Sequence, residues 1–530
     1  MPASAGDSLS LRCVTRTNRV LLMDLLLGLD LGTTNCKALI VDTKGQPVAH
    51  ATTRTPCRSV SASGPGASSR LDVPEYDAEA LWHTGARLIR EALANLPPDQ
   101  HVAAIAVCSM AEAGVLIDDR GDPLASILTW YDQRTMPFVE WWHARISDKR
   151  IFNITGLPPD HTYSAHKLLW HREQAPQAFS RARTWLCLAD WITYCLTGER
   201  TTSHSMASRT MLFDVQSRCW SQELLDVADL PPSLMPPAFP SGQVVGYVTP
   251  RAASLTGLQP WTPVVTGGHD HMCGALAAGS VEPGTVVDSA GTAEAMLVVL
   301  DTLTLDETTA GSTLCFGCHT VPDRYYLLGG VMGGGVVSWV SRVLTGDDSP
   351  DSVNRLMGEA AASPLGANNL WFLPYLEGKG PPAQTPEAWG AWLGLRLGHS
   401  RADLVRAAME GLSFRIRHMY EDMVAVAGYR ASELRAVGGG TRNTWWQQLK
   451  ANAMGMSIET PALSDVGAQG TALLAGMGVG VFANAAEAAA VAYCSAERYS
   501  VDEVEFHLYD RKYHDYLRLC REMATMSLLP

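Results

Sequence analysis

The sequence predicts an α/β fold of two domains, and three observations favour it. With 530 residues, the chain is about three times as long as a typical domain. Apolar runs of strand character alternate with helical patterns along its length, which is typical of α/β proteins. The opening order, a strand that enters a Gly-rich turn and is followed by another strand, recurs from Pro263 onward, although no sequence repeat of fixed period is present.

The composition indicates an ordinary globular protein whose partner is a small molecule. Hydrophobic residues make up 46% and charged residues 18% of the chain, which excludes a disordered or fibrous protein. Lys and Arg number 41 and Asp and Glu number 54, giving a net charge of −13. This balance argues against binding to nucleic acid or to an anionic membrane surface.

The N-terminal segment does not read as an export signal. Asp24 and Asp30 interrupt the apolar stretch that follows the first arginines, and no small-residue cleavage site follows it. The uncharged stretch 468–486 contains four glycines and reads as packed core. We therefore expect a cytoplasmic protein, with residues 1–22 as a disordered extension or a mis-assigned start ahead of Met23.

In the first part of the chain, apolar runs and turns predict a three-stranded antiparallel meander over 25–54. A helix is expected over 78–96, with strands over 102–108 and 115–118. The five prolines within 230–240 suggest a connection between domains. We place the first domain at 23–258 and the second at 259–530.

The second part is expected to contain the same kinds of elements. A strand from Pro263 ends at the turn Gly-Gly-His-Asp-His and precedes a short helix over 273–278, and two further strands flank the turn Ser289–Thr292. The remaining pattern predicts helices over 401–426 and 445–454, strands at 434–437 and around 458, and a helix from Gly467.

Two hairpin turns are candidates for holding phosphate, because the usual P-loop and dinucleotide motifs are absent. In the first turn, Asp30 could attract Mg²⁺ through water while Gly32, Thr33 and Thr34 cradle phosphate oxygens, with Lys37 as a nearby cation. The second turn, Ser289–Thr292, likewise offers a glycine, hydroxyl side chains and backbone N–H groups. A plain β-turn is the alternative for either turn alone.

Asp270 is the sharpest candidate for catalysis. A carboxylate on a Gly-rich turn at the end of an apolar strand can accept the proton of a substrate hydroxyl, and it can also cap the following helix. His269 and His271 suggest a metal, but without a third ligand nearby we favour packing or hydrogen bonds to the substrate. The segment 315–319 fits the haem attachment pattern Cys-x-x-Cys-His, yet its flanks alternate like a buried strand, so we interpret it as a chance match.

Several motifs together resemble those of the FGGY carbohydrate kinases, a family of the actin-like ATPase superfamily. They include DLGTTNCKA from Asp30, WYDQR from Trp130, GGHDHMCGALAAG from Gly267 and GGGTRNTWWQQLKANAMG from Gly438. The resemblance implies two actin-like, ribonuclease H-like domains with the active site in the cleft between them. It also implies phosphorylation of a sugar or polyol hydroxyl with ATP and Mg²⁺ as cofactors. A homodimer is an analogy only, and the sequence does not fix the oligomeric state.

The resemblance also assigns roles to residues by motif position. Asp270 would be the general base, and Asp30 would organise Mg²⁺. The residues that would contact phosphate or line the nucleotide pocket are Gly32, Thr33, Thr34, Lys37, Gly291, Thr292, Gly334, Gly438, Gly439, Gly440 and Asn443. The residues that would contact the sugar are Met110, Glu112, Trp130, Asp132, Asp270 and His271.

The identity of the substrate stays open between ketoses and polyols. Met110, Ala111 and Glu112 stand where xylulose kinases usually have Gln-Met-His, while the Gly-His-Asp form of the base motif is similar to that of fuculokinases. Glycerol kinases carry a polyol-binding Glu at the position of Glu112, but the Arg they use beside it is Ala111 here. Asp132 could bind sugar hydroxyls, or it could form a salt bridge with Arg134 at a helix start.

We therefore expect an ATP-dependent kinase of a ketopentose or a deoxyketohexose. A glycerol or tetritol kinase is the first alternative. A non-catalytic, nucleotide-dependent sensor on the same scaffold is the second, and the presence of Asp270 argues against it.

Overall fold

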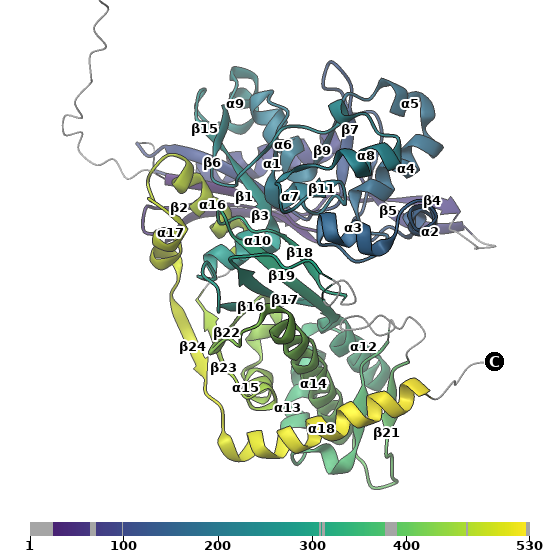
Figure 1. Ribbon diagram of the computed structural model, residues 1–530. Helices are drawn as coiled ribbons and strands as arrows, with labels where there is room; N and C mark the ends of the chain where they lie inside the picture. Colours follow the sequence, from purple (N-terminus) through teal and green to yellow (C-terminus); the bar gives the residue numbers. More distant parts are fainter. Residues whose placement is uncertain are drawn as a thin grey trace, which may run out of the picture.

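The computed structural model describes residues 25–63, 70–97, 99–306, 309, 313–376, 389–462 and 465–525. The expected extension of residues 1–22 lies outside the described residues. Two large sheets form the centres of two domains, the first drawn in purple to teal and the second in teal-green to yellow (Figure 1). The alternation of strands and helices in both domains confirms the α/β prediction.

The first sheet contains six strands in the order β14-β15-β6-β1-β2-β3. The predicted meander is present, because β1, β2 and β3 pair antiparallel in sequence order. β6 and β15 extend the sheet in parallel from β1, and β14 closes it antiparallel. The bounds are β1 (Leu25–Leu31), β2 (Asn35–Val41), β3 (Pro47–Arg54), β6 (Val102–Ser109), β14 (Val244–Tyr247) and β15 (Pro263–His269).

The second sheet contains seven strands in the order β18-β19-β17-β16-β22-β23-β24. From β19 to β24, the order and the directions of the strands match those from β3 to β14 in the first sheet. The two sheets therefore share the order and the directions of six strands, although the edge strand β14 precedes β15 in the chain whereas β24 follows β23. The bounds are β16 (Val286–Ala290), β17 (Ala293–Leu300), β18 (Cys315–Cys318), β19 (Tyr325–Met332), β22 (Glu433–Val437), β23 (Ser457–Pro461) and β24 (Ser495–Tyr499).

The predicted domain boundary at 258/259 is wrong for the sheets. The strand from Pro263 is β15, which pairs with β6 in the first sheet, so the second sheet begins only at Val286. An apolar strand followed by a Gly-rich turn does not reveal which sheet it joins. The proline-rich stretch 230–240 does not connect the domains either, because Ala238–Phe239 (β13) pairs with Thr202–Ser203 (β10) inside the first domain.

Helices cover the sheets, and the first domain also contains small sheets of two or three short strands. The helices of the first domain are α1 (Ala78–Ala94), α2 (Pro137–His143), α3 (Asp148–Thr155), α4 (Ser164–Gln174), α5 (Pro176–Arg181), α6 (Leu188–Thr197), α7 (His204–Ala207), α8 (Gln222–Ala228) and α9 (Pro250–Thr256). The smaller pairings join β4 (Arg58–Ser63), β5 (Arg70–Tyr76) and β8 (Ile127–Leu128), β7 (Gly114–Ile117) and β9 (Thr184–Cys187), and β11 (Phe213–Asp214) and β12 (Cys219–Trp220).

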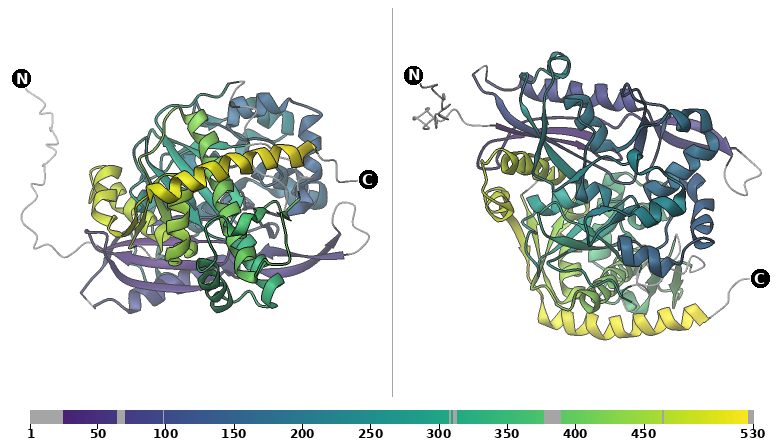
Figure 2. Two further views of the ribbon diagram at one scale, coloured as in Figure 1. Left: turned by 90° about the horizontal axis from the view of Figure 1, so that it is seen from below. Right: turned by 45° about the horizontal axis from the view of Figure 1, so that its top comes forward.

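The second domain is built around one long helix. Its helices are α12 (Gly334–Thr345), α13 (Pro350–Ala361), α14 (Arg401–Ala427), α15 (Thr444–Met454), α17 (Ala485–Ala492) and α18 (Glu503–Thr525), with the hairpin β20 (Trp371–Leu373) and β21 (Ala391–Leu393) beside them. α18 lies along the end of the molecule that is farthest from the first sheet (Figure 2). Phe414 of α14 packs against three tyrosines of α18, which anchors this helix.

Two helices, α10 (Asp270–Ala277) and α16 (Val466–Gly478), join the domains. α10 contributes Cys273 and Leu276 to the core of the first sheet and Met272 and Ala275 to a core shared with the second sheet. α16 packs on the first sheet although it follows most of the second domain in sequence. A Cβ built on Gly470 would lie 1.8 Å from the carbonyl oxygen of Cys273. Glycine is therefore required where these two helices touch.

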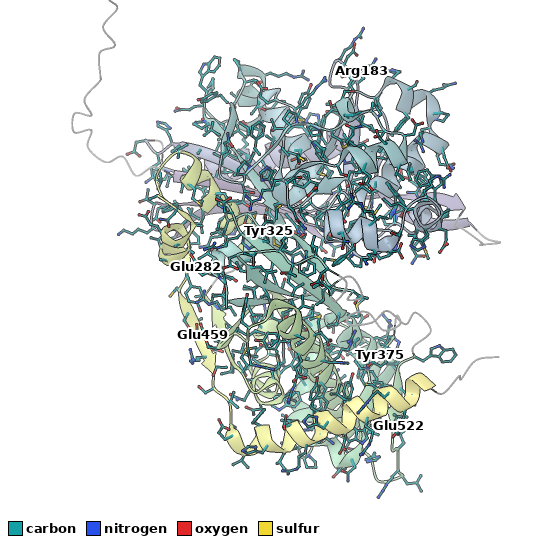
Figure 3. The ribbon with its side chains drawn as sticks, in the orientation of Figure 1. Arg183, Glu282, Tyr325, Tyr375, Glu459 and Glu522 are labelled. Atoms are coloured by element: carbon teal, nitrogen blue, oxygen red, sulfur yellow. The ribbon has the colours of Figure 1, made fainter. Side chains whose placement is uncertain are left out.

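Polar contacts also connect the domains outside these helices. Tyr325 of β19 lies where the two domains meet (Figure 3), and the guanidinium of Arg218 stacks 4.9 Å from the centre of its ring.

Among the described helices, none has both the length and the apolar character that crossing a membrane requires.

Candidate active site

A bulge in β15 aims Asp270 at the space between the domains. The pairing of β15 with β6 shifts register between Thr266 and Gly268. A Cβ on Gly267 would lie 1.8 Å from the carbonyl oxygen of Val107, so only glycine fits this bulge. The strand then ends at His269, and Asp270 is the first residue of α10. The sequence predicts this position for the carboxylate, but not the bulge that directs it.

Asp270 keeps one carboxylate oxygen free. Its Oδ1 accepts a 2.7 Å hydrogen bond from the backbone N–H of His271 and lies 3.2 Å from Nε2 of His269. Its Oδ2 accepts no hydrogen bond from the described residues, and a quarter of the side chain is exposed. Burial raises the pKa of Asp270 to about 7, and the charge of Glu112 adds to this rise. A carboxylate that is oriented, partly exposed and poised near neutral pH suits a general base.

Asp30 lies on the same side of the first sheet. In β1 it pairs with Cys108 of β6, which in turn pairs with Gly268 of β15, so both carboxylates lie at the carboxyl ends of parallel strands. Burial raises the pKa of Asp30 to about 7, and the charge of Asp270 contributes. Its Oδ1 is buried without a hydrogen-bond partner. An oxygen ligand without a partner, beside a second carboxylate, fits a hard divalent cation such as Mg²⁺.

These carboxylates line a cavity of about 550 Å³ between the domains. The first domain contributes Asp30, Lys37, Asp270 and His271, and the second contributes Val287, Ser289, Gly438, Gly439, Thr441 and Arg442. Lys37 forms a 2.6 Å ion pair with Asp465, which precedes α16. Six of the residues predicted for the nucleotide, the metal or the sugar thus share one cavity. Arg442, a cation in the glycine loop, was not among the predicted site residues.

The first hairpin turn lies beside the cavity. Thr33 and Thr34 are exposed, and Gly32 donates its N–H to the carbonyl oxygen of Asn35 at 3.0 Å to close the turn. Thr33 Oγ1 accepts a 3.1 Å hydrogen bond from Trp130 Nε1 and also lies 3.8 Å from the sulfur of Met110. The predicted phosphate turn therefore contacts two residues predicted for the sugar.

The second hairpin turn meets two other glycine segments. Gly291 and Thr292 are exposed, and the N–H of Gly334 donates to the carbonyl oxygen of Gly291 at 3.0 Å, which starts α12 at this turn. Gly438 adopts φ 96°, and a Cβ there would lie 2.8 Å from the carbonyl oxygen of Ala290. A third glycine, Gly440, packs on the Ala290 side chain. Three of the predicted glycines, Gly334, Gly438 and Gly440, thus converge around one turn.

Asn443, which is predicted to line the nucleotide pocket, also has a structural role. Its Oδ1 accepts a 2.9 Å hydrogen bond from the N–H of Trp446 and so caps α15 directly after the glycine loop.

A buried charge cluster that sequence reasoning missed lies under the second hairpin. Lys450 of α15 donates to Oδ2 of Asp288 at 2.7 Å and to Oε1 of Glu294 at 2.6 Å, and all three side chains are fully buried. Burial and the charge of Asp288 raise the pKa of Glu294 to about 8. This triad ties the strands of the hairpin to the helix that follows the glycine loop.

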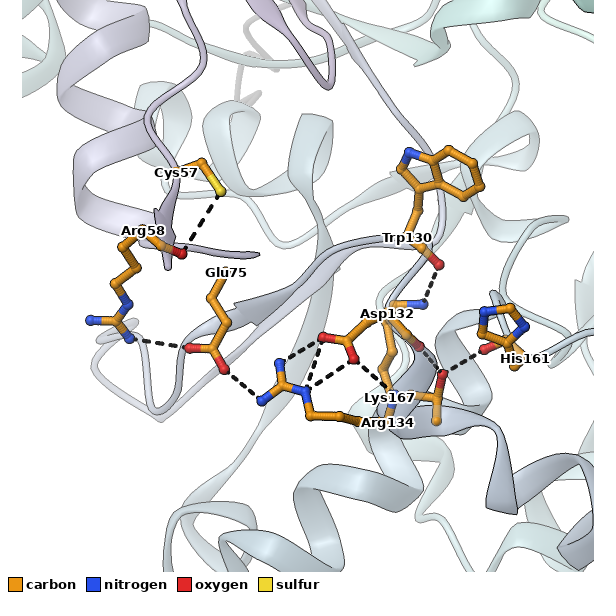
Figure 4. A network of polar contacts seen from close by, with 9 residues as sticks. Cys57, Arg58, Glu75, Trp130, Asp132, Arg134, His161 and Lys167 are labelled. Carbon is orange, nitrogen blue, oxygen red and sulfur yellow. Dashed lines mark hydrogen bonds and ion pairs between the residues drawn. The ribbon is translucent and has the colours of Figure 1, made fainter. Parts of the chain in front are cut away.

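Asp132 does not face the cavity, which corrects its assignment to the sugar. Figure 4 shows its carboxylate held by Arg134, which in turn binds Glu75. Asp132 also accepts the N–H of Arg134 at 2.9 Å, and its side chain has no exposed surface. The alternative interpretation, a salt bridge at a helix start, is the one that the structure contains. Both oxygens of the carboxylate are taken, so none remains for a hydroxyl.

Glu112 is paired with an arginine that no sequence pattern pointed to. Arg209, 97 positions further along the chain, donates from Nε to Oε1 of Glu112 at 2.6 Å, and both side chains are buried. The sequence lacks an arginine beside Glu112, and the fold supplies one from the loop after α7.

The Cys-x-x-Cys-His segment is the buried strand that its alternation suggests. Cys315 and Cys318 bound β18, Cys318 is buried, and Nδ1 of His319 accepts the N–H of Val321 at 3.0 Å.

Comparison with known families gives matches over both domains. The model of the FGGY family of carbohydrate kinases, N-terminal domain, matches residues 25–277, and the model of the C-terminal domain of the same family matches residues 286–479. The gap between these two ranges falls between α10 and β16, in agreement with the sheets.

Curated relatives and solved structures extend over nearly the whole chain. A xylulose kinase of Staphylococcus epidermidis is 27% identical over 95% of this chain and 98% of its own length. An L-fuculokinase of Escherichia coli is 30% identical over 88% of this chain and 95% of its own length. The crystal structure of a xylulose kinase from Rhodospirillum rubrum superposes with a TM-score of 0.83 at 28% identity, over 94% of this chain and 99% of that one.

Proposed function

The chain belongs to the FGGY family of carbohydrate kinases, which makes it an ATP-dependent sugar kinase of two actin-like domains, and we propose that its substrate is a ketose. We propose further that the γ-phosphate is transferred to a hydroxyl of a ketopentose or a deoxyketohexose, with Asp270 as the general base. The relatives named xylulose kinase and L-fuculokinase support the ketose assignment.

The observation that carries the base assignment is the free Oδ2 of Asp270 at the wall of the cavity. Phosphoryl transfer depends mainly on in-line positioning and on charge stabilisation, and the protein must also take one proton from the attacking hydroxyl. Asp270 is held by the backbone of His271 and by His269, so its free oxygen keeps one direction. Because burial raises its pKa to about 7, the carboxylate is basic enough to accept this proton near neutral pH.

Asp30 would hold Mg²⁺ through its oxygen without a partner, and the bound ion would offset the charge of the transferred phosphate. Lys37 and Arg442 are the cations of this chain that line the described cavity. The turns at Thr33, Thr34 and Thr292 offer hydroxyls and N–H groups next to it. We assign these groups to the phosphates of ATP.

The glycine loop and α12 would hold the remainder of the nucleotide. Gly438 and Gly439 line the cavity without side chains, so a ligand can approach their backbone closely. The start of α12 at Gly334 lies against the second hairpin turn. Asn443 and Gly440 stand at the far end of the same loop.

An acyclic polyol is the second candidate substrate, because Glu112 and Arg209 together present the pair of charges that glycerol kinases place on adjacent residues. Met110 and Trp130 would contact either kind of substrate. The two candidates differ in whether a ketose or a polyol turns over.

The test is an ADP-release assay with Mg·ATP and a panel of ketopentoses, deoxyketohexoses, ketotetroses, tetritols and glycerol, with ATP alone as the baseline. We expect one ketose to raise ADP release well above the baseline. Asp270→Asn should abolish sugar phosphorylation and retain nucleotide binding. A response to polyols alone would replace the ketose assignment, and full activity of Asp270→Asn would overturn the base assignment. A flat panel with intact ATP binding would point first to a sugar outside the panel and only then to a non-catalytic sensor.

A further inference from the structure

The carboxylate proposed to hold Mg²⁺ has a lysine directly beside it. Asp30 of β1 and Lys37 of β2 stand opposite each other in an antiparallel strand pair. The side chains of such a pair lie on the same face of the sheet, with their Cβ atoms about 5 Å apart, and both residues line the cavity. The flexible stem of a lysine spans this separation. Lys37 could therefore form an ion pair with Asp30 and take the place of the metal ion.

In the structure, Lys37 turns to a different carboxylate. Its Nζ lies 2.6 Å from Oδ1 of Asp465, which is its ion-pair partner among the described residues. Oδ1 of Asp30 is buried and accepts no hydrogen bond from the described part of the chain. The pairing of Lys37 with Asp465 thus leaves an oxygen of Asp30 open to a cation.

The start of α16 brings Asp465 to this place. Asp465 directly precedes the helix, and its side chain makes no hydrogen bond that caps α16, so its carboxylate is available to Lys37. The first turn of the same helix touches Asp30, because a Cβ built on Gly467 would lie 2.9 Å from Oδ2 of Asp30. One helix start therefore supplies the partner of Lys37 and packs against the metal-binding carboxylate.

The ion pair is suited to a temporary role. About 29% of the Lys37 side chain and 22% of the Asp465 side chain are exposed, and ion pairs that water reaches are weak. The positive end of the α16 dipole also stabilises the negative charge of Asp465 when the lysine leaves. Lys37 can therefore exchange Asp465 for a phosphate at little cost.

We infer that Asp465 is a positioning residue that keeps the metal site at Asp30 open, because it holds Lys37 aside until the phosphates of ATP bind this lysine. The inference rests on the proposed function and deepens it. Without the carboxylate of Asp465, Lys37 turns to Asp30, and its ammonium group competes with the metal ion for the same oxygens. Metal binding then weakens although the metal ligand itself is unchanged.

The experiment measures the binding of Mn²⁺ to the full chain in the presence of equimolar ADP. Mn²⁺ prefers carboxylate oxygens as Mg²⁺ does, and its electron paramagnetic resonance signal reports the free ion, with ADP alone as the reference. Asp465→Asn should raise the Kd for Mn²⁺ about tenfold, because loss of a residue that orients a metal ligand costs about 10–100-fold in affinity. Asparagine suits the start of a helix. If this variant does not fold, Asp465→Ser carries the test.

The same substitution in a Lys37→Met background separates positioning from charge. Asp465→Asn removes a negative charge, which by itself would weaken cation binding in either background. If Asp465 acts by holding Lys37, the substitution should change the Kd for Mn²⁺ less than about twofold once the lysine is absent. An equal rise of the Kd in both backgrounds would overturn the inference, and so would an unchanged Kd in Asp465→Asn.

Two control variants show where a failure lies. Glu282→Gln also removes a negative charge and a 2.7 Å ion pair, with Arg324, and should leave the Kd for Mn²⁺ within about twofold of the wild type. Asp30→Asn should weaken Mn²⁺ binding more than Asp465→Asn does. If Asp30→Asn binds Mn²⁺ as the wild type does, the metal assignment of the proposed function is wrong and this inference falls with it. If Asp30→Asn loses the ion but Asp465→Asn keeps it, the inference alone is overturned.

Discussion

Replacing Gly267 by alanine tests whether the bulge in β15 positions the base. The new Cβ would lie 1.8 Å from the carbonyl oxygen of Val107, whereas ordinary contacts begin at 3.4 Å. The two atoms must therefore separate by 3.4 − 1.8, or about 1.6 Å. Val107 lies inside β6, which pairs with β1 and β15, whereas β14 pairs with β15 only up to Val265, so the movement falls on the end of β15 and on Asp270.

A displacement of this size should cost catalysis more than it costs stability. A misplacement of about 1 Å can reduce a rate about 100-fold, so we expect kcat to fall by about that factor or more. The strain of overpacking should lower the free energy of unfolding by about 1–3 kcal/mol. For a domain of this size, each kcal/mol lowers Tm by about 2–4 °C. Nucleotide affinity should change little, because Gly438 and Gly439 lie in the loop after β22, in the other domain.

The assay measures kcat with the best sugar, Kd for ATP by calorimetry and Tm by thermal unfolding. Gly358→Ala is the matched control, because a Cβ on this glycine of α13 would meet no atom within 4 Å. The control should keep full activity and gain up to about 1 kcal/mol in stability from helix propensity. A Gly267→Ala enzyme with kcat within about threefold of the wild type and an unchanged Tm would refute the reasoning.

Four further predictions concern titration and buried charge. Asp270 must be ionised to accept a proton, and its pKa is raised to about 7. We therefore expect kcat/KM for the sugar to rise about tenfold per pH unit below pH 7 and to level off above it. A flat profile from pH 5 to 8 would contradict the assignment of Asp270 as the base. Lys450→Met should lower the free energy of unfolding by about 3–5 kcal/mol in urea titrations, because it leaves Asp288 and Glu294 buried without the cation that they share. Glu294→Gln should lower the free energy of unfolding less than Lys450→Met does near pH 7. The pKa of Glu294 is raised from 4.5 to about 8, so the contribution of this group to stability declines as the pH rises through that window. Equal losses of stability in both variants would argue against the triad. Asp132→Asn should destabilise the fold by about 3 kcal/mol and leave the KM for the sugar unchanged, and a large rise in that KM would restore Asp132 to the substrate site.

Much of the local structure was readable from periodicity and turn residues. Helix α1 was predicted as 78–96 and spans Ala78–Ala94, and helix α14 was predicted as 401–426 and spans Arg401–Ala427. Both have side-chain caps at their starts, from Asp77 and Ser400. Such signals are local, so one sequence suffices to find them.

The errors arose where pairing across the chain decides the outcome. Whether β15 joins the first or the second sheet depends on its pairing with β6. Nothing in the residues of β15 indicates that pairing. Asp132 looked available although its partner Arg134 is two residues away, because nothing local shows that Glu75, 59 positions earlier, also holds Arg134 and that the Asp132 side chain is buried. The pair of Glu112 with Arg209 and the triad around Lys450 were missed for the same reason, because their partners lie 97 and 156 or more positions apart.

The position of α16 has a consequence for how the chain folds during synthesis. The core of the first sheet includes Leu26 and Ala106 near the start of the chain, and it is completed by Ala468, Ala472 and Leu473 of α16. A ribosome that adds about 5–20 residues per second needs roughly 10–40 seconds to proceed from the end of α10 to α16. During that interval the nascent first domain exposes an apolar face that only a later part of the same chain can cover. Nascent chains arrested before Val466 should therefore engage chaperones, and arrest beyond Gly478 should release them.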